Sequence, residues 1–380
     1  MSERTCDVAV VGGGLVGTAL AYELATSGAD VVVVDGHHPG RASDAGAGIL
    51  SPETTWKPDD GWLSFGRAAA GHYRTLVSRL AEEGAPDTGF AECGLLLVAV
   101  EADVDDWFAT CADLALGRSP ATVTEVTSDD ARALFPPLGE VRRALHNPAA
   151  ARVDGRLMTA ALLHGAERRG VRRMEANAGA LRVRDGRVVG IDGHGCALSC
   201  GAVAIAAGAW SQTFGNQLGV PLPVHPVKGQ IVHMQLPPTD DGAAVDSGRW
   251  PIVEPVFNHY LVAWPDGRVV CGGTYELDAG FDARPTIAGL EQLLRACLAI
   301  APGLAEASVA DVRVGLRPVS ADDLPVLGPV PGWDNVHLVT GHGTDGLLLG
   351  PYSAALVARC LLGGPVADEL RPFSVARFEA

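Results

Sequence analysis

The sequence lacks the features that mark several large classes of protein. It contains no run of about 18 or more apolar residues, the length that a transmembrane helix needs. Its first residues carry neither a basic segment nor a cleavable apolar one. Blocks of like charge, internal repeats and low-complexity segments are also absent, which argues against disorder. We therefore expect a soluble protein located in the cytoplasm.

Positive charge is scarce. Only Lys57 and Lys228 are lysines, and 29 basic against 45 acidic residues give a net charge of −16. This balance argues against a nucleic acid or an anionic membrane surface as a partner. A small-molecule partner is the remaining expectation.

The eight cysteines form no recognisable pattern. Cys196 and Cys200 are the closest pair, and their spacing does not suit a zinc site. The adjacent His37 and His38 have no further ligands nearby in the sequence. The sequence therefore predicts free thiols, with neither a disulfide framework nor a metal site.

A strand, a glycine-rich turn, a helix and a second strand follow one another at the start of the chain. The apolar strand 7–11 leads into Gly12, Gly14 and Gly17, and the second strand ends at Asp35. Gly12 permits a sharp turn, Gly14 lets a pyrophosphate approach the backbone, and Gly17 lets the helix pack closely on the sheet. Free N–H groups and the helix dipole favour phosphates at such a helix start.

Asp35 lies at the spacing expected for a carboxylate that binds a ribose. Residue 36 is Gly, with no adjacent arginine to meet a 2′-phosphate, which argues against NADP. A glycine turn alone can be purely structural. Because strand, turn, helix, strand and acid occur here in order, we predict that this unit binds a dinucleotide.

The next stretch, residues 40–50, is made almost entirely of small residues. It would form a poor core, but it suits a loop whose N–H groups face a flat ring system. A flexible linker is the alternative. The apolar pair Ile49-Leu50 and the following Pro52 favour the ligand-binding interpretation.

Hydrophobic periodicity and turn residues predict the remaining elements. Residues 56–62 are expected to form an exposed loop, and the turn Asp185-Gly186 predicts a hairpin. The expected helices are 18–27, 63–83, 104–116, 128–134, 153–169, 287–298 and 347–362. The expected strands after Asp35 are 94–100, 180–183, 187–191, 202–206, 230–234, 260–263, 269–273, 312–318 and 336–340.

Seven motifs occur in an order that resembles one family of flavoenzymes. They are residues 12–17, 46–50, 207–211, 226–230, 260–262 with 267–270, 315–318, and 341–342 with 346. The chain is thus similar to the FAD-dependent D-amino-acid oxidase, sarcosine oxidase and glycine oxidase family, with glycine oxidase nearest in appearance. The resemblance covers nearly the whole chain.

This resemblance implies an α/β composite fold with two domains. A discontinuous Rossmann-like FAD-binding domain would comprise residues 1–55, 145–222 and 325–380. A substrate domain with a mixed or antiparallel sheet would comprise residues 56–144 and 223–324. The FAD is expected to be noncovalent, because no cysteine stands near Gly315, where members with covalent flavin carry one.

The resemblance further implies oxidation of a C–N bond to an imine, with hydride passing to flavin N5 and O2 giving H2O2. In the family, an arginine at the position of Arg317 and a tyrosine at the position of Tyr260 hold the substrate carboxylate. A planar guanidinium suits that role because it forms two parallel charge-assisted hydrogen bonds. A structural arginine and a core tyrosine are the alternatives for these residues.

The sequence departs from the glycine oxidase pattern in three regions. Thr344 and Asp345 replace a region that contains an arginine, Asn258 stands where a histidine is expected, and Gly179 replaces an apolar residue near the adenine. Thr344 and Asp345 become candidate substrate contacts. The expected cofactor contacts are Gly12, Gly14, Leu15, Val16, Gly17, Asp35, Arg41, Ala42, Ser43, Gly46, Ala47, Gly48, Ile49, Gly179, Ala207, Gly208, Trp210, Arg317, Gly343, Thr344, Asp345, Gly346 and Leu347.

Several functional alternatives remain open at this point. A 2-hydroxy-acid oxidase, or a dehydrogenase with another electron acceptor, would use the same scaffold, since Arg317 would hold either carboxylate. A flavin-binding protein without catalysis is a third possibility. The later glycine turns argue against an NAD-dependent dehydrogenase. The oligomeric state and the role of Lys228 are not determined by the sequence.

Overall fold

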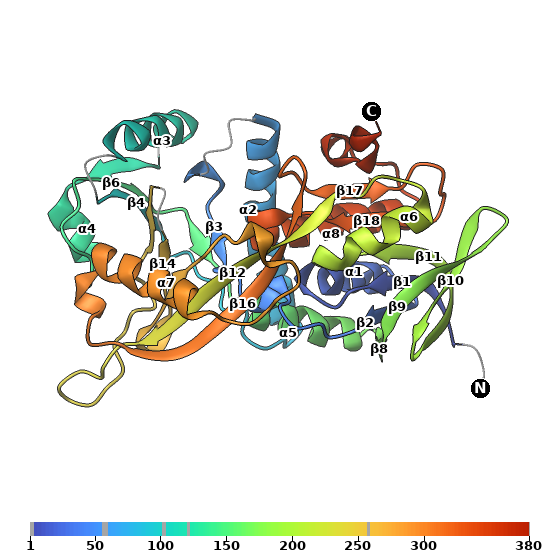
Figure 1. The fold of residues 1–380 in the computed structure, drawn as a ribbon, viewed down its shortest axis with the longest axis horizontal. Coiled ribbons are helices and arrows are strands. Elements are labelled where there is room, and N and C mark those ends of the chain that lie inside the picture. The colour runs from blue at the N-terminus through green and yellow to red at the C-terminus, as the bar shows by residue number, and fades with distance from the viewer. Residues whose placement is uncertain (1–3, 55–59, 101–103, 120–121, 257–258, 380) are drawn as a thin grey trace.

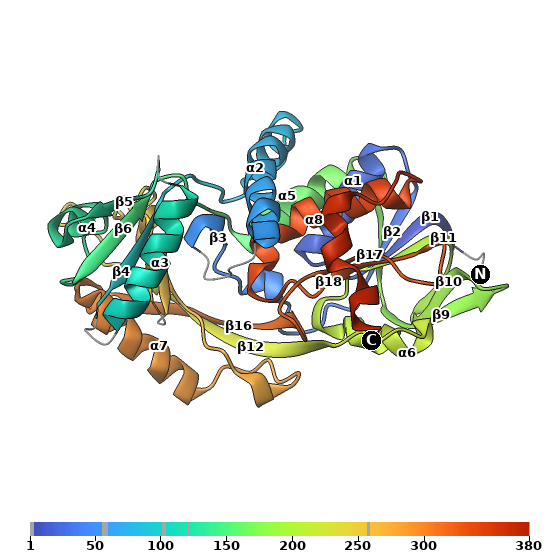
Figure 2. The ribbon, with the colours of Figure 1, turned by 90° about the horizontal axis from the view of Figure 1, so that it is seen from above.

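Two eight-stranded sheets lie at opposite ends of an elongated molecule (Figures 1 and 2). The computed structural model describes residues 4–54, 60–100, 104–119, 122–256 and 259–379. Residues 56–59 of the predicted exposed loop, and Asn258, lie outside the described residues. The predicted α/β composite fold is confirmed.

The first sheet is parallel at its centre and buried on both faces. Strand β1 pairs in parallel with β2 and β11, and the alternating side chains of β1 enter two separate cores. Burial on both faces explains why β2 reads as a continuous run of valines. The strand order is β17 (Val326–Pro329), β18 (Val336–Thr340), β11 (Cys196–Ile205), β1 (Arg4–Val11), β2 (Val31–Asp35) and β8 (Arg172–Glu175), with the hairpin β9 (Asn177–Arg184) and β10 (Arg187–His194) attached to β11.

Helices cover one face of this sheet. Helices α1 (Leu15–Thr26), α5 (Gly155–Glu167) and α8 (Gly346–Leu361) share one core with the sheet. Helix α5 begins at the side chain of Asp154, which accepts hydrogen bonds from the N–H groups of Arg156 and Leu157. This cap agrees with the predicted helix start near residue 154.

The second sheet is mainly antiparallel. Its order is β16 (Ser308–Ser320), β12 (Val224–Gln235), β15 (Arg268–Gly272), β14 (Tyr260–Ala263), β13 (Ile252–Pro255), β4 (Leu95–Ala99), β6 (Arg143–Asn147) and β5 (Thr124–Val126). Helix α7 (Ile287–Ile300) packs on one face, and α3 (Asp105–Arg118) packs on the other (Figure 2). The short helix α4 (Ser128–Leu134) has the predicted bounds.

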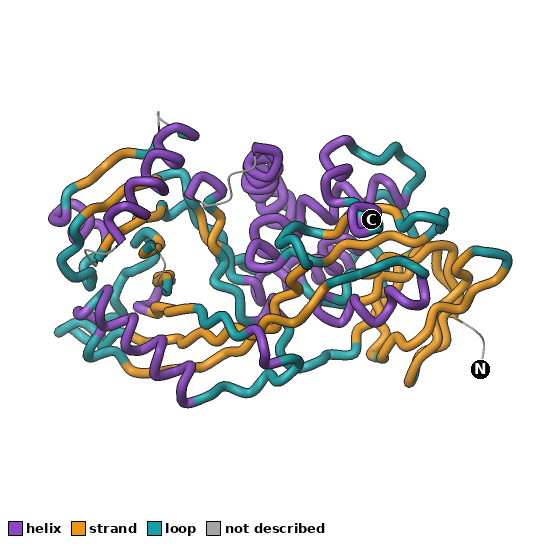
Figure 3. The backbone as a smooth tube through the Cα atoms, turned by 45° about the horizontal axis from the view of Figure 1, so that its top comes forward, coloured by secondary structure: helices purple, strands orange, loops and turns teal. Residues whose placement is uncertain are grey.

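The long pair β12 and β16 extends from the second sheet to the first. Figure 3 shows these strands passing below the helices at the centre of the molecule. On the facing side, the small sheet of β3 (Ile49–Leu50) and β7 (Ala151–Arg152) bounds the same region. The two sheets therefore meet where the sequence motifs converge.

Helix α2 (Asp60–Glu82) packs where the sequence interpretation did not expect it. Its buried Phe65, Tyr73 and Leu80 lie in the core that contains α1 and α8. Residues 56–144 were assigned to the substrate domain, and the domain boundaries stay a prediction. The exposed loop predicted to reach residue 62 is wrong at its end, because Trp62 is helical and 1% exposed.

The helix and strand predictions hold at most positions, and the hairpin at Asp185-Gly186 is confirmed, with positive φ at both residues. Strands β3, β5 to β8, β13 and β17 were missed; each is five residues or shorter. The cysteines whose side chains the structure describes are free, and the described residues hold no metal-ligating cluster. No helix in the described ranges has the length and apolarity to cross a membrane. The cytoplasmic location stays a prediction.

Candidate active site

A cavity of about 660 Å3 lies between the two sheets. Gly17 and Gly179, two predicted cofactor contacts, do not line it. Gly17 instead faces the backbone of Gly12, and Gly179 is held on β9 by Gln217. The other predicted residues line the wall: Gly12, Gly14, Leu15, Val16, Asp35, Arg41, Ala42, Ser43, Gly46, Ala47, Gly48, Ile49, Ala207, Gly208, Trp210, Tyr260, Arg317, Gly343, Thr344, Asp345, Gly346 and Leu347.

The turn after β1 requires glycine. Gly12 has φ +106°, and a Cβ there would lie 2.4 Å from the carbonyl oxygen of Ala206. A Cβ on Gly17 would lie 1.9 Å from the carbonyl oxygen of Gly12, so helix and strand touch through backbone alone. Gly14 caps α1 without a side-chain hydrogen bond and faces the cavity. This end of the cavity thus presents a helix N-terminus free of bulky side chains, which suits a pyrophosphate.

The carboxylate at the end of β2 lies beside this turn. Asp35 forms an ion pair with Arg41, whose Nη1 also donates to the carbonyl oxygen of Gly13 at 3.3 Å. The hydroxyl of Ser43 accepts the N–H of Leu15 at 2.9 Å. Arg41 and Ser43 therefore fix residues 41–43 against the start of α1, and Asp35 keeps acceptor oxygens at the cavity edge.

The wall beyond Ser43 is made of small residues and backbone. Gly48 has φ +80°, and a Cβ there would lie 1.8 Å from the carbonyl oxygen of Val153. Opposite, the start of α8 is held by the hydroxyl of Tyr73, which donates to the carbonyl oxygen of Leu347. A dinucleotide turn that continues into a flat, small-residue wall fits an FAD lying along the cavity. The described residues therefore fit this cofactor.

The other end of the cavity carries charged side chains. Arg317, on β16, donates from Nη1 to the carbonyl oxygen of Thr274 at 2.9 Å. Gly229 on the paired strand makes room for the guanidinium, because a Cβ there would lie 2.1 Å from Nη1. Among the described residues, no carboxylate forms an ion pair with Arg317. The guanidinium is thus a held cation that faces the cavity.

Tyr260 lies beside this arginine. Its hydroxyl interacts with Arg317, while burial raises the pKa of Tyr260 to about 12. The phenol consequently stays protonated at neutral pH and can donate a hydrogen bond. Arg317 and Tyr260 thus place a cation and a hydrogen-bond donor side by side in the cavity wall, an arrangement that would suit a carboxylate.

Sequence reasoning missed Glu254, which also lines this end of the cavity. Thr54 donates to Glu254 Oε2 at 3.3 Å, and burial raises the pKa of this carboxyl to about 7. The signal was available in the sequence, since Glu254 is the one charged residue in the otherwise apolar run 251–256. A charge inside a buried strand is unusual and indicates function.

Thr344 and Asp345 reach the cavity from the start of α8. The preceding His342, also in the wall, is buried, and burial lowers its pKa to about 4. A contact of 3.1 Å joins its Nε2 to the Ser353 hydroxyl. This neutral histidine positions the turn at the start of α8.

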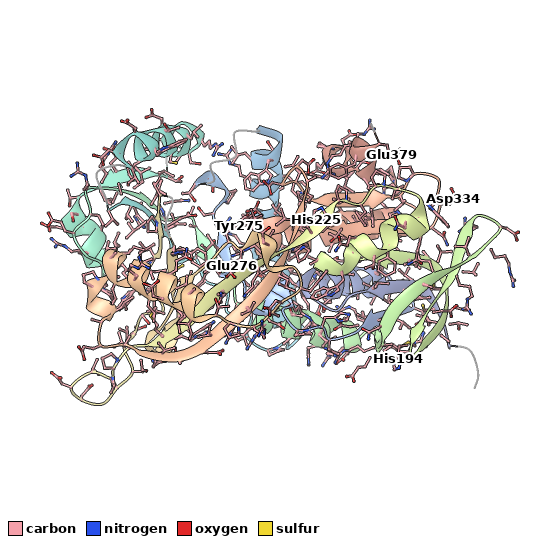
Figure 4. The ribbon with its side chains drawn as sticks, in the orientation of Figure 1. His194, His225, Tyr275, Glu276, Asp334 and Glu379 are labelled. Atoms are coloured by element: carbon pink, nitrogen blue, oxygen red, sulfur yellow. The ribbon has the colours of Figure 1, made fainter. Side chains whose placement is uncertain are left out.

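The structure also resolves where Lys228 lies. Its side chain is 2% exposed and its Nζ is 3.2 Å from Glu276 Oε2. Gly229, the next residue on β12, lines the cavity, so Lys228 faces the opposite side of the strand. Figure 4 shows Glu276 beside Tyr275, over the middle of β12. Lys228 therefore supports the strand behind Arg317 and does not line the cavity.

The glycine turn, the small-residue wall and the cavity-facing Arg317 fit an FAD-dependent oxidoreductase. The family model "DAO: FAD dependent oxidoreductase" matches residues 7–360. The chain belongs to this family of FAD-dependent oxidoreductases, and FAD is its cofactor.

Known relatives span nearly the whole chain. The iminodiacetate oxidase (IdaA) of Chelativorans sp. BNC1 superposes with a TM-score of 0.89 at 36% identity, covering 97% of this chain and 98% of that one. The uncharacterized oxidoreductase YurR of Bacillus subtilis is 35% identical, covering 97% of this chain and 98% of its own length. The glycine oxidase of Pseudomonas aeruginosa is 33% identical, and the match covers 99% of each chain.

Proposed function

We propose that the protein oxidises an amino acid or an N-alkyl amino acid to the corresponding imine, with O2 as electron acceptor and H2O2 as product. The observation that carries the proposal is Arg317, a held guanidinium in the cavity with no carboxylate partner among the described residues. Relatives named glycine oxidase and iminodiacetate oxidase support it, because both named substrates carry a carboxylate one carbon from a nitrogen.

In this proposal the chain's own residues bind and orient the substrate. Arg317 donates two parallel hydrogen bonds to the carboxylate, and the protonated hydroxyl of Tyr260 donates a third. Holding both oxygens fixes the direction of the Cα–H bond relative to the small-residue wall. Bound FAD supplies the two-electron acceptor. The buried wall excludes water until the imine leaves and hydrolyses.

Two alternatives share this geometry. A 2-hydroxy acid also presents a carboxylate to Arg317, and a dehydrogenase passes its electrons to an acceptor other than O2. The test is anaerobic reduction of the bound flavin by amino, N-methyl-amino and 2-hydroxy acids, followed by admission of air.

The proposal predicts that an amino or N-methyl-amino acid bleaches the flavin, and that the yellow colour returns in air as peroxide forms. Bleaching that persists in air would instead indicate a dehydrogenase. Bleaching by hydroxy acids alone would overturn the assignment to C–N bonds.

A further inference from the structure

Glu254 is a cavity carboxylate that has no part in the function proposed above. Glu254 is partly exposed, and it lines the cavity. No arginine, lysine or histidine among the described residues lies within ion-pair distance of its oxygens, and Thr54 is its hydrogen-bond donor at 3.3 Å. Placing a carboxylate there without a counter-charge costs stability, so a ligand that supplies the counter-charge would remove that cost.

The neighbours of Glu254 hold it in place. The Thr54 hydroxyl also lies 3.1 Å from the hydroxyl of Ser51, which in turn accepts from Asn147 Nδ2 at 3.2 Å. These contacts connect β13 with the segment after β3 and with β6. The carboxylate is therefore held by a chain of polar groups, although none of them carries a positive charge.

A positive and a negative side chain both lie near Tyr260. Arg317 lowers and Glu254 raises the pKa of its phenol, which places both charges within electrostatic reach of one ring. Asp345 adds a second negative charge that acts on Glu254. Among the described residues, this end of the cavity thus carries the cation Arg317 and the carboxylates of Glu254 and Asp345. A molecule with a carboxylate and a positively charged nitrogen is complementary to that arrangement.

We propose that Glu254 binds the positively charged nitrogen of the substrate while Arg317 holds its carboxylate, so that the site selects zwitterions over 2-hydroxy acids. This inference rests on the proposed function, because it names the residue that would recognise the nitrogen of an amino acid substrate. A hydroxy acid would leave Glu254 without a counter-charge and would bind more weakly.

The test uses two ligands of the same shape that differ in one charge. Betaine has a quaternary nitrogen without a lone pair, which prevents oxidation to an imine, and 3,3-dimethylbutanoate replaces that nitrogen with carbon. The dissociation constant of each is measured from the flavin absorbance of the FAD-loaded enzyme at pH 8.5. The proteins are wild type, Glu254→Gln and the control Glu125→Gln, whose exposed carboxylate lies on β5 of the same sheet, outside the cavity.

Wild type and Glu125→Gln should bind betaine about 10-fold or more tightly than 3,3-dimethylbutanoate, because the carbon analogue lacks the positive charge that would pair with Glu254. In Glu254→Gln this preference should fall to about 1, while the affinity for 3,3-dimethylbutanoate changes by less than about 3-fold. A preference that survives in Glu254→Gln, or that is missing in wild type, would overturn the inference.

A pH series adds a second readout. Betaine affinity of wild type should rise between pH 6 and 8 as Glu254 ionises, whereas the affinity for 3,3-dimethylbutanoate should not rise. Within the described ranges, the other titratable groups that act on Glu254 or are acted on by it are Asp345, Tyr260 and Cys111. The pKa values of Tyr260 and Cys111 are raised, so neither gains charge in that range.

Failure of this inference is distinguishable from failure of the proposed function. Betaine binding does not require turnover, whereas the proposed function fails when no amino acid bleaches the flavin. An enzyme that is bleached by amino acids but shows no charge preference would retain its proposed function and lose the nitrogen site.

Discussion

The two ends of the cavity are built in different ways. The cofactor end consists of backbone and small residues. A Cβ would collide with backbone atoms at Gly12 and Gly48, and Gly14 leaves the cavity wall open at the start of α1. The substrate end consists of charged and polar side chains, including Arg317 and Glu254, brought from separate strands. The first end is therefore fixed by chain geometry, and the second is open to change by single substitutions without loss of the fold.

The largest effect is expected at the cofactor end. Gly17→Ala places a Cβ 1.9 Å from the carbonyl oxygen of Gly12, a backbone atom that cannot move without shifting α1 from the sheet. We expect a loss of about 3–5 kcal/mol of unfolding free energy, measured by urea denaturation.

The matched control is Gly71→Ala on α2, where a Cβ meets nothing within 4 Å. It should be neutral or stabilising by up to about 1 kcal/mol, because alanine favours a helix. Equal behaviour of the two variants would contradict the close helix–strand contact.

Gly14→Ala should separate cofactor binding from folding. Its Cβ would meet the Ser43 hydroxyl at 3.2 Å, a contact that a small side-chain shift relieves, so the chain should fold. The methyl group faces the cavity at the start of α1, where we expect phosphate. FAD affinity should fall about 10- to 100-fold, as expected for interference with a helix N-terminal anion site, measured by fluorescence titration of the apoprotein. Unchanged FAD affinity would indicate that the phosphates do not bind at this turn.

At the substrate end, Glu254→Gln should increase stability while it weakens betaine binding. Burial raises the pKa of Glu254 from 4.5 to about 7. The native state therefore binds a proton that the unfolded state has released in this range, and its stability decreases as pH rises from 4.5 to 7. Glutamine removes that cost, so the variant should be more stable by about 1–3 kcal/mol at pH 8 and equal to wild type near pH 4.5. Urea denaturation at both pH values measures this, and a variant less stable at pH 8 would assign Glu254 a structural role.

The smallest effect on catalysis is expected for Lys228→Met. The lysine lies on the side of β12 away from the cavity, and its partner Glu276 keeps hydrogen bonds from Gln230 and Thr274. The rate at which O2 reoxidises the reduced flavin should change by less than about 3-fold, since the side chain does not touch the cavity. A large fall in the stopped-flow reoxidation rate would place Lys228 in the oxidative half-reaction.

The contrast between the two ends also explains what the sequence predicted. The cofactor frame follows from local order, because strand, glycine turn, helix and acid are contiguous between residues 7 and 35. The same locality predicted the hairpin at Asp185-Gly186 and the helix that begins near residue 154. Gly179 was taken from the family resemblance and does not line the cavity, and no local pattern specifies how β9 lies relative to β2.

The substrate end depends on pairing between distant strands. Arg317 and Tyr260 were identified through a family resemblance, since nothing local shows that β16 and β14 face one cavity. Glu254 was missed although its apolar context was visible, because its role depends on β13 lying beside β14. The packing of helix α2 against α1 and α8 was not predicted for a similar reason: its apolar face does not specify which core it joins.

The central claim is that Arg317 binds the substrate and that FAD binding does not depend on Arg317. The direct test is anaerobic stopped-flow reduction of wild type, Arg317→Ala and the control Arg313→Ala, whose side chain lies on the same strand, pairs with Asp311 and does not line the cavity. The best amino acid of the substrate panel is used, and FAD content is measured in parallel. Arg317→Ala should keep its FAD and lose about 1,000-fold in the ratio of reduction rate to substrate dissociation constant, as expected for loss of a buried charge-assisted pair. Unchanged reduction, or loss of flavin from Arg317→Ala alone, would contradict the claim.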